Sequence, residues 1–165
     1  MQSWPSRNLK SDMKIALGSD HAGFELKEDL RAFLAEMKIE ALDLGTYSED
    51  SVDYPDVAVK VAEKVARGEV ERGLLICGTG IGMSIVANRF PGVRAALCHD
   101  LCTARVSREH NNANILAMGG RVTGKGLARE MLKVFLETEF QGGRHERRVN
   151  KIAALKPEAG SGKKK

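Results

Sequence analysis

A short apolar run that ends in three alternating glycines, near the middle of the chain, limits the fold more than any other feature. Residues 74–83 read LLICGTGIGM. The run from Leu74 to Cys77 suits a buried strand, and a helical pattern follows from Met83. Glycine accepts backbone angles and close contacts that other residues avoid, so these glycines predict a tight turn. The segment therefore predicts a strand–turn–helix unit, which is the repeating unit of parallel sheets.

The same turn predicts an anion-binding site. Gly78, Gly80 and Gly82 lack a Cβ, so successive backbone N–H groups can converge on an anion at the start of a helix. Cys77 lies at the edge of this turn, where the positive helix end would favour its thiolate. A base and an anion hole are thus neighbours in the sequence. The alternative is a structural cysteine, since cysteine is among the most buried residue types.

A dinucleotide-binding turn is a second alternative, because that fingerprint also follows a strand and opens a helix. It needs Gly or Ala where this chain has Met83. Asp100, however, lies near the spacing expected of a ribose-binding acid. A nucleotide-binding module without catalytic activity therefore remains open at this point.

Strand and helix patterns alternate through most of the chain. Apolar runs predict five strands, at 14–17, 40–44, 74–77, 93–97 and 115–118. Helical patterns are found at 24–37, 55–67, 83–89, 101–109, 125–139 and 149–155. Strands separated by helices imply a single α/β domain with a doubly wound, Rossmann-like fold: a five-stranded parallel sheet with helices on both faces.

Composition shifts at both ends predict that this domain spans residues 13–155. Residues 1–12 have no periodicity, and residues 156–165 are polar and basic, so both are expected to be disordered extensions. The net charge of +4 arises within these extensions. A charge-balanced domain with 5% aromatic residues predicts no nucleic-acid partner. The sequence has no run of about 18 apolar residues, so we expect no membrane span.

The three cysteines show no disulfide spacing, which is typical of a reduced, cytoplasmic protein. Cys98, His99 and Cys102 are close enough in sequence to suggest metal ligands. A zinc site needs four ligands, and no second cluster supplies the rest. We therefore expect no metal site.

Polar residues follow the predicted strands at their carboxyl ends, where doubly wound sheets bind ligands. They include Asp20, His21, His99, Asp100 and Arg121. His110 and Asn111 end a predicted helix, and Arg144 and Arg148 are four residues apart, a spacing that suits two guanidinium groups on one phosphate. Together with the cysteine and the glycine turn, these groups predict a site for a small phosphorylated molecule. The favoured chemistry is proton abstraction next to a carbonyl.

Five motifs occur in order: GSDHAG at 18–23, DYP at 53–55, LICGTGIG at 75–82, SREHN at 107–111 and GGRH at 142–145. Together they resemble the ribose-5-phosphate isomerase type B family, which also contains galactose-6-phosphate isomerase subunits. The resemblance covers roughly residues 13–155. It implies a metal-free aldose–ketose isomerase of the pentose phosphate pathway, without a cofactor. It also implies a homodimer, often paired into a homotetramer, whose active sites use both subunits.

The resemblance further implies a role for each matching residue. Cys77 would be the base that moves a proton between C2 and C1, with help from Thr79. The backbone N–H groups of Gly78, Thr79, Gly80, Ile81 and Gly82 would hold the enediolate oxygen. His110 would open the furanose ring. Substrate contacts would come from Asp20 and Asn111 on sugar hydroxyls, Tyr54 near the ring, and His21, Arg121, Arg144 and Arg148 on the phosphate.

The favoured reaction is therefore the interconversion of D-ribose 5-phosphate and D-ribulose 5-phosphate. A hexose 6-phosphate, such as allose or galactose 6-phosphate, is the alternative substrate. Only the depth of the pocket between the glycine turn and the arginines would distinguish the two.

Overall fold

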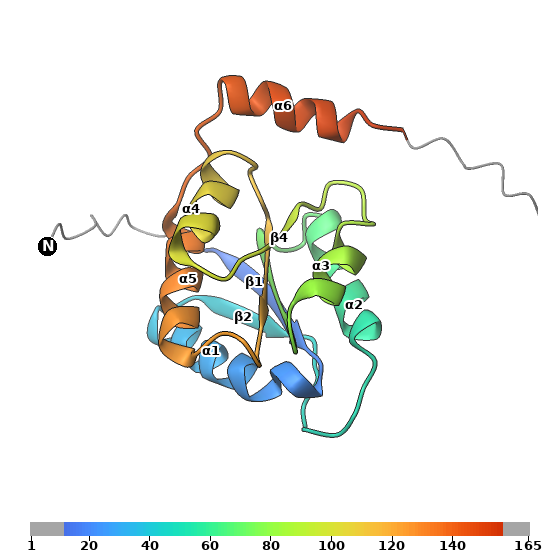
Figure 1. Ribbon diagram of the computed structural model, residues 1–165, viewed down its shortest axis with the longest axis vertical. Helices are drawn as coiled ribbons and strands as arrows, with labels where there is room; N and C mark the ends of the chain where they lie inside the picture. Colours follow the sequence, from blue (N-terminus) through green and yellow to red (C-terminus); the bar gives the residue numbers. More distant parts are fainter. Residues whose placement is uncertain (1–11, 157–165) are drawn as a thin grey trace, which may run out of the picture.

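The computed structural model describes residues 12–156, and these form a five-stranded parallel sheet with the strand order β2-β1-β3-β5-β4 (Figure 1). The strands are β1 Lys14–Ser19, β2 Glu40–Asp43, β3 Arg72–Cys77, β4 Ala95–Leu97 and β5 Ile115–Gly119. The predicted doubly wound α/β fold is confirmed. Apart from Asp12 and Lys156, the predicted terminal extensions lie outside the described residues, and their disorder stays a prediction.

Helices cover both faces of the sheet. They are α1 Phe24–Glu36, α2 Tyr54–Ala66, α3 Ile81–Ala87, α4 Leu101–Glu109, α5 Lys125–Glu137 and α6 Arg144–Ala153, with a 3₁₀ turn, η1, at His21–Gly23. Successive strand residues point to opposite faces. Leu74 and Ile76 of β3 therefore pack with α1, α4 and α5, whereas Leu75 and Cys77 pack with α2 and α3. The central strand is thus buried on both faces.

Helix α6 lies apart from these two layers, at the edge of the sheet where the strands begin (Figure 1). The sequence predicts its start at residue 149, but the helix begins at Arg144. Gly142 and Gly143, both with positive φ, turn the chain immediately before it. The first turn was missed because its residues are mostly charged and add little to the apolar periodicity. Arg144 and Arg148 consequently lie on one helix, as their spacing predicts.

Several other boundaries differ from prediction by one or two residues, and two of these differences have a clear local reason. Helix α3 starts at Ile81 instead of residue 83, because Gly80, in the left-handed region at φ 80°, turns the chain directly into it. Strand β4 starts at Ala95 instead of residue 93, because Asn114 Oδ1 accepts a hydrogen bond from Arg94 N in place of a ladder partner. Both differences leave the sheet order unchanged.

Candidate active site

Three turns meet where β1, β3 and β5 end, and glycines allow their backbones to touch. A Cβ on Gly23 would lie 2.5 Å from Ile76 O, and one on Gly120 would lie 2.7 Å from Ala22 O. Asp20 N donates to Ile76 O at 3.2 Å, and Gly120 N donates to Cys77 O at 2.7 Å. The residues that follow these strands are therefore held close together by backbone hydrogen bonds.

Cys77 ends β3 and is 5% exposed. Its Sγ accepts a hydrogen bond from Gly80 N at 3.1 Å, and such a donor stabilises sulfur most strongly when it is a thiolate. Thr79 Oγ1 accepts from Ile81 N at 3.3 Å. Two of the N–H groups predicted to hold an enediolate oxygen thus point to the side chains of Cys77 and Thr79 in this structure.

Arg121 and Tyr54 flank the glycine turn on its two sides. A Cβ on Gly78 would lie 3.3 Å from Arg121 Nη1, and one on Gly82 would lie 2.5 Å from Tyr54 Cζ. Tyr54 belongs to the first turn of α2, and its side chain keeps 39% of its surface exposed. The turn therefore has a cation on one side, which suits a phosphate, and an aromatic ring on the other, which suits the carbon chain of a sugar.

Asp20 and His21 follow β1 in the same region. Asp20 is 7% exposed, and its Oδ1 accepts from Gly23 N at 3.1 Å, so it caps η1. His21 Nδ1 accepts from Val52 N at 3.3 Å. Because an imidazole nitrogen that accepts carries no proton, neutral His21 has its proton on Nε2. We call Asp20, His21, Tyr54, residues 77–82 and Arg121 the carboxyl-edge cluster.

The remaining predicted residues lie at the opposite edge of the sheet. His110 ends α4, and Asn111 follows it, in the loop that leads into the start of β5. The His110 ring stacks on the His145 ring of α6, with centroids 4.2 Å apart and an interplanar angle of 6°. This places Arg144 and Arg148 of α6 near His110. We call His110, Asn111, Arg144 and Arg148 the amino-edge cluster.

One chain therefore does not bring all predicted site residues together. The two clusters are separated by the length of the parallel strands, because β3 ends at Cys77 whereas the loop after His110 leads into the beginning of β5. The resemblance implies active sites that use both subunits, so this separation within one chain is compatible with it, and the joint site of Cys77, Arg144 and Arg148 stays a prediction. The motifs themselves name residues and not the edge at which each one lies, so the separation is seen only in the structure.

Arg108 supports the amino-edge cluster and was assigned no role from the sequence, although it lies within the SREHN motif. It is 3% exposed. Its Nη1 donates to Asn112 Oδ1 at 2.9 Å and also to Ala113 O, and its Nε donates to Thr138 O at 3.3 Å. Burial, followed by the charges of Arg72 and Arg94, lowers the pKa of Arg108 to about 9. The buried guanidinium thus joins the loop after His110 to the segment that leads to α6.

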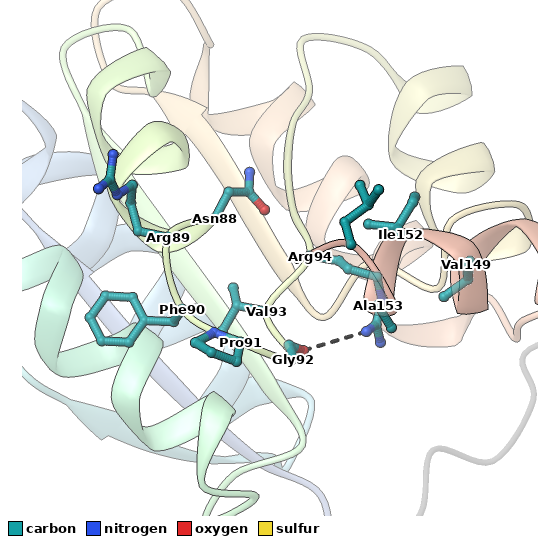
Figure 2. A pocket seen from close by; sticks show the side chains of 11 residues that line it. Asn88, Arg89, Phe90, Pro91, Gly92, Val93, Arg94, Val149, Ile152 and Ala153 are labelled. Carbon is teal, nitrogen blue, oxygen red and sulfur yellow. Dashed lines mark hydrogen bonds between the residues drawn. The ribbon is translucent and has the colours of Figure 1, made fainter. Parts of the chain in front are cut away.

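Helix α6 spans a hollow and does not pack closely on the body of its own chain (Figure 2). A cavity of about 330 Å³ lies between residues 88–94 and the residues Val149, Ile152, Ala153 and Leu155. A neighbouring cavity of about 480 Å³ is lined by Asn88, residues 93–96, Asn111, Ala113 and Ile152. Ile152 remains 53% exposed. Much of the apolar side of α6 is therefore uncovered by the described chain.

Comparison with known proteins now decides the family. The ribose/galactose isomerase family model matches residues 15–152. The chain belongs to this family. It is 49% identical over 142 residues to ribose-5-phosphate isomerase B of Escherichia coli, a match that covers 86% of this chain and 95% of that protein. It is 42% identical over 144 residues to D-erythrulose-4-phosphate isomerase of Pectobacterium atrosepticum, which covers 85% and 93%, respectively.

Solved structures in the ribose/galactose isomerase family share the fold. The ribose 5-phosphate isomerase of Thermotoga maritima superimposes with a TM-score of 0.85 at 55% sequence identity, covering 87% of this chain and 99% of that one. The resemblance to the type B family is therefore confirmed, and the protein is a sugar-phosphate isomerase. The nucleotide-binding alternative loses its basis: Met83 is fully buried in the core, and the Asp100 carboxylate caps α4 by accepting from Thr103 N at 2.7 Å.

Two further expectations concern metals and membranes. Cys98 is buried and Cys102 is exposed, and within residues 12–156 no three His, Cys, Asp or Glu side chains are grouped so as to hold a metal ion. None of the helices in that range is both long and apolar enough to cross a membrane.

Proposed function

We propose that this member of the ribose/galactose isomerase family interconverts D-ribose 5-phosphate and D-ribulose 5-phosphate through an enediolate. The observation that carries the proposal is the position of Cys77 Sγ, 3.1 Å from Gly80 N within the turn that Arg121 and Tyr54 flank. A sulfur base, amide donors and a phosphate-binding cation are thus adjacent. The name of the Escherichia coli relative supports the five-carbon substrate.

In the forward direction, the Cys77 thiolate takes the proton from C2 of the open-chain aldose. The electron pair of the broken C–H bond forms the C1–C2 double bond, and the C1 carbonyl oxygen takes up the negative charge. Backbone N–H groups of residues 78–82 stabilise that charge as it develops. The thiol then returns the proton to C1, while the proton of the C2 hydroxyl passes to the C1 oxygen, which leaves a ketone at C2, a hydroxyl at C1 and the thiolate as it was, so atoms and charge balance. Thr79 assists this transfer, and His110 opens the ring beforehand.

The complete site needs a second copy of the chain. Cys77 and Arg144 lie at opposite edges of one sheet, so we propose that the amino-edge cluster of one subunit completes the carboxyl-edge cluster of another. The partner's surface would also cover apolar residues that are exposed here, including Ile81, Ile85 and Ile152. Asp20 and Asn111 would hold sugar hydroxyls, and His21, Arg121, Arg144 and Arg148 would hold the phosphate. The assembly would be a homodimer or a homotetramer.

The proposed base needs a reducing compartment, because oxidation of Cys77 would remove the thiolate. We therefore place the enzyme in the cytoplasm. Its task there would be in the pentose phosphate pathway.

The experiment that tests the proposal replaces Cys77 with Ala. We expect kcat for ribose 5-phosphate to fall roughly 10²–10⁴-fold, since this is the usual contribution of a general base and the thiol is the only one proposed. Ribose 5-phosphate should still bind the variant with nearly unchanged affinity. Normal turnover in Cys77→Ala would exclude Cys77 as the base.

Two other substrates have specific support. The Pectobacterium relative is named for a four-carbon sugar phosphate, and the description of the family includes galactose. The values of kcat/KM for D-erythrulose 4-phosphate, ribose 5-phosphate, allose 6-phosphate and galactose 6-phosphate, measured side by side, rank these substrates. A hexose phosphate or erythrulose 4-phosphate with the highest value would replace the five-carbon assignment.

A further inference from the structure

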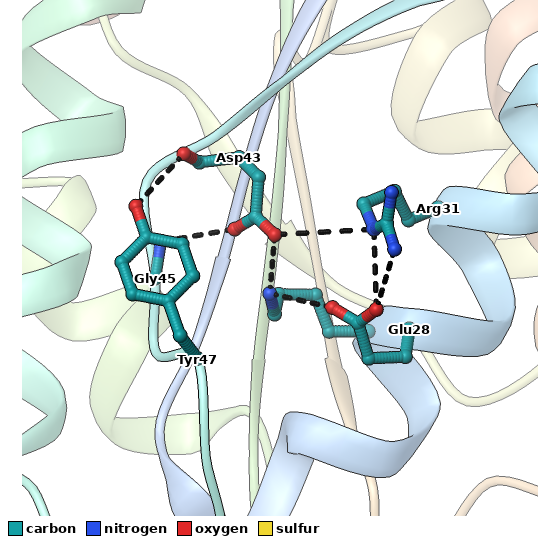
Figure 3. A network of polar contacts seen from close by, with 6 residues as sticks. Glu28, Arg31, Asp43, Gly45 and Tyr47 are labelled. Carbon is teal, nitrogen blue, oxygen red and sulfur yellow. Dashed lines mark hydrogen bonds and ion pairs between the residues drawn. The ribbon is translucent and has the colours of Figure 1, made fainter.

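Lys27 of α1 is fully buried, with 0% of its surface exposed. Its Nζ donates to Asp43 Oδ2 at 2.6 Å and to Glu28 Oε1 at 3.0 Å (Figure 3). The rings of Phe24 and Tyr47 each lie 5.5 Å from the same nitrogen. A desolvated ammonium group is costly unless it is paired and hydrogen-bonded. Asp43, at the end of β2, is the closest partner of this ammonium group.

Asp43 extends this pairing into the loop after β2. Its Oδ1 accepts from Gly45 N at 3.0 Å, and its backbone O accepts from Tyr47 Oη at 3.1 Å (Figure 3). Gly45 O in turn accepts from Ser19 N at 2.7 Å, and Thr46 N donates to Ser19 O at 2.7 Å. The loop is thus bonded to the residue immediately before Asp20.

The far end of the same loop reaches the carboxyl-edge cluster directly. Val52 N donates to His21 Nδ1 at 3.3 Å, and this bond leaves the proton of neutral His21 on Nε2. Tyr54, two residues later, begins α2 and packs against Gly82. Residues 43–54 therefore connect the partly buried Lys27–Asp43 ion pair to two side chains that the proposed function assigns to substrate binding.

We propose that Lys27, acting through Asp43, is a positioning residue for substrate binding. The ion pair holds residues 43–54 in the arrangement that orients His21 and sets Tyr54 beside the glycine turn. Removing the ammonium group leaves the Asp43 carboxylate without its closest cation. Arg31, which is half-exposed with its Nε 4.0 Å from Asp43 Oδ2, is the next nearest, and pairing with it draws Asp43 toward the surface. This inference rests on the proposed function for the roles of His21 and Tyr54.

The test compares Lys27→Met, which keeps the length of the side chain but not its charge, with Lys125→Met. The control removes an exposed ion pair between α5 and Glu25 of α1. In Lys27→Met we expect KM for ribose 5-phosphate to rise about tenfold, the scale of one charge-assisted hydrogen bond, with kcat changed less than about threefold. Hydrogen exchange at the amides of Thr46 and Val52 should accelerate by at least about tenfold. Lys125→Met should match the wild type in all three measurements.

The double variant Lys27→Met/Asp43→Asn keeps the test usable if the single variant does not fold, because it removes the partly buried Asp43 carboxylate together with its closest cation. Unchanged exchange at Thr46 and Val52 in a folded variant overturns the proposal, and so does faster exchange with an unchanged KM. If the wild type turns over no sugar phosphate, the proposed function fails. The dissociation constant of ribose 5-phosphate, measured by calorimetry, then replaces KM in deciding the role of Lys27.

Discussion

The imidazole rings of His110 and His145 stack in parallel, 4.2 Å apart between centroids, and so join the end of α4 to the first turn of α6. His145 is 7% exposed. Two stacked imidazolium ions would repel each other, so the contact favours the state in which at least one ring is neutral. Burial, followed by the positive charges of His110, Arg144 and Arg148, lowers the pKa of His145 below its ordinary value.

Acidification should therefore lower the free energy of unfolding, because His145 binds a proton less readily in the folded chain than in the unfolded one. The unfolded chain binds the proton at the ordinary pKa of about 6.5, whereas the folded chain binds it only at lower pH. The contribution of neutral His145 to the free energy of unfolding is then complete above about pH 6.5 and is lost as the pH falls through the interval below it. Urea unfolding of the wild type and of His145→Gln, compared from about pH 8 to about pH 5, measures this. The stability advantage of the wild type should shrink toward acid pH, and a constant difference would contradict the assignment.

Adding one methyl group at Gly82 should impair substrate binding. Its Cβ would lie 2.5 Å from Tyr54 Cζ, so the ring must move away from the glycine turn. We expect Gly82→Ala to raise KM for ribose 5-phosphate by about tenfold or more while the chain still folds, because Tyr54 is partly exposed and can swing out. Gly126→Ala is the matched control: it also lies on a helix, nothing lies within 4 Å of its Cβ, and a gain of about 0.5–1 kcal/mol in stability is expected there. Equal KM values for the two variants would show that Tyr54 does not contact the substrate.

Local patterns are sufficient to predict most of this fold. The run from Leu74 to Cys77 and the alternation of strands and helices predict the sheet, because strand burial and helix periodicity are encoded within each segment. The glycines at 78, 80 and 82 predict a tight turn whose backbone other groups can approach closely. They do not predict that Arg121 and Tyr54 are the side chains that do so. Cys77 at its edge follows from the same pattern.

What the sequence leaves out is arrangement over long distances. The ion pair between Lys27 and Asp43 joins residues 16 positions apart. In the sequence, Lys27 cannot be distinguished from a lysine on the solvated face of a helix. The hydrogen bond from Arg108 to Thr138 O spans 30 positions and is likewise not predictable from the local pattern. Most important, the motifs of Cys77 and Arg144 follow one another in order although the fold separates them, since strand direction sets the edge at which each motif lies.

The separation of the two clusters leads to a mixing experiment. Cys77→Ala damages the carboxyl-edge cluster, and Arg144→Ala/Arg148→Ala damages the amino-edge cluster, so each variant alone should be nearly inactive. If each site combines one cluster from each of two subunits, a mixed dimer contains one intact site and one doubly damaged site. Equal amounts of the two variants exchange subunits at random when they are mildly unfolded and refolded together. About a quarter of the wild-type activity should then return, because half of the dimers are mixed and one of the two sites in each mixed dimer is intact. Cys77→Ala mixed with Arg121→Ala, both altered at the same edge, should restore none. If subunit exchange is verified and the activity still equals the sum of the two separate variants, the whole site lies within one chain. Helix α6 would then have to reach the opposite edge of its own sheet.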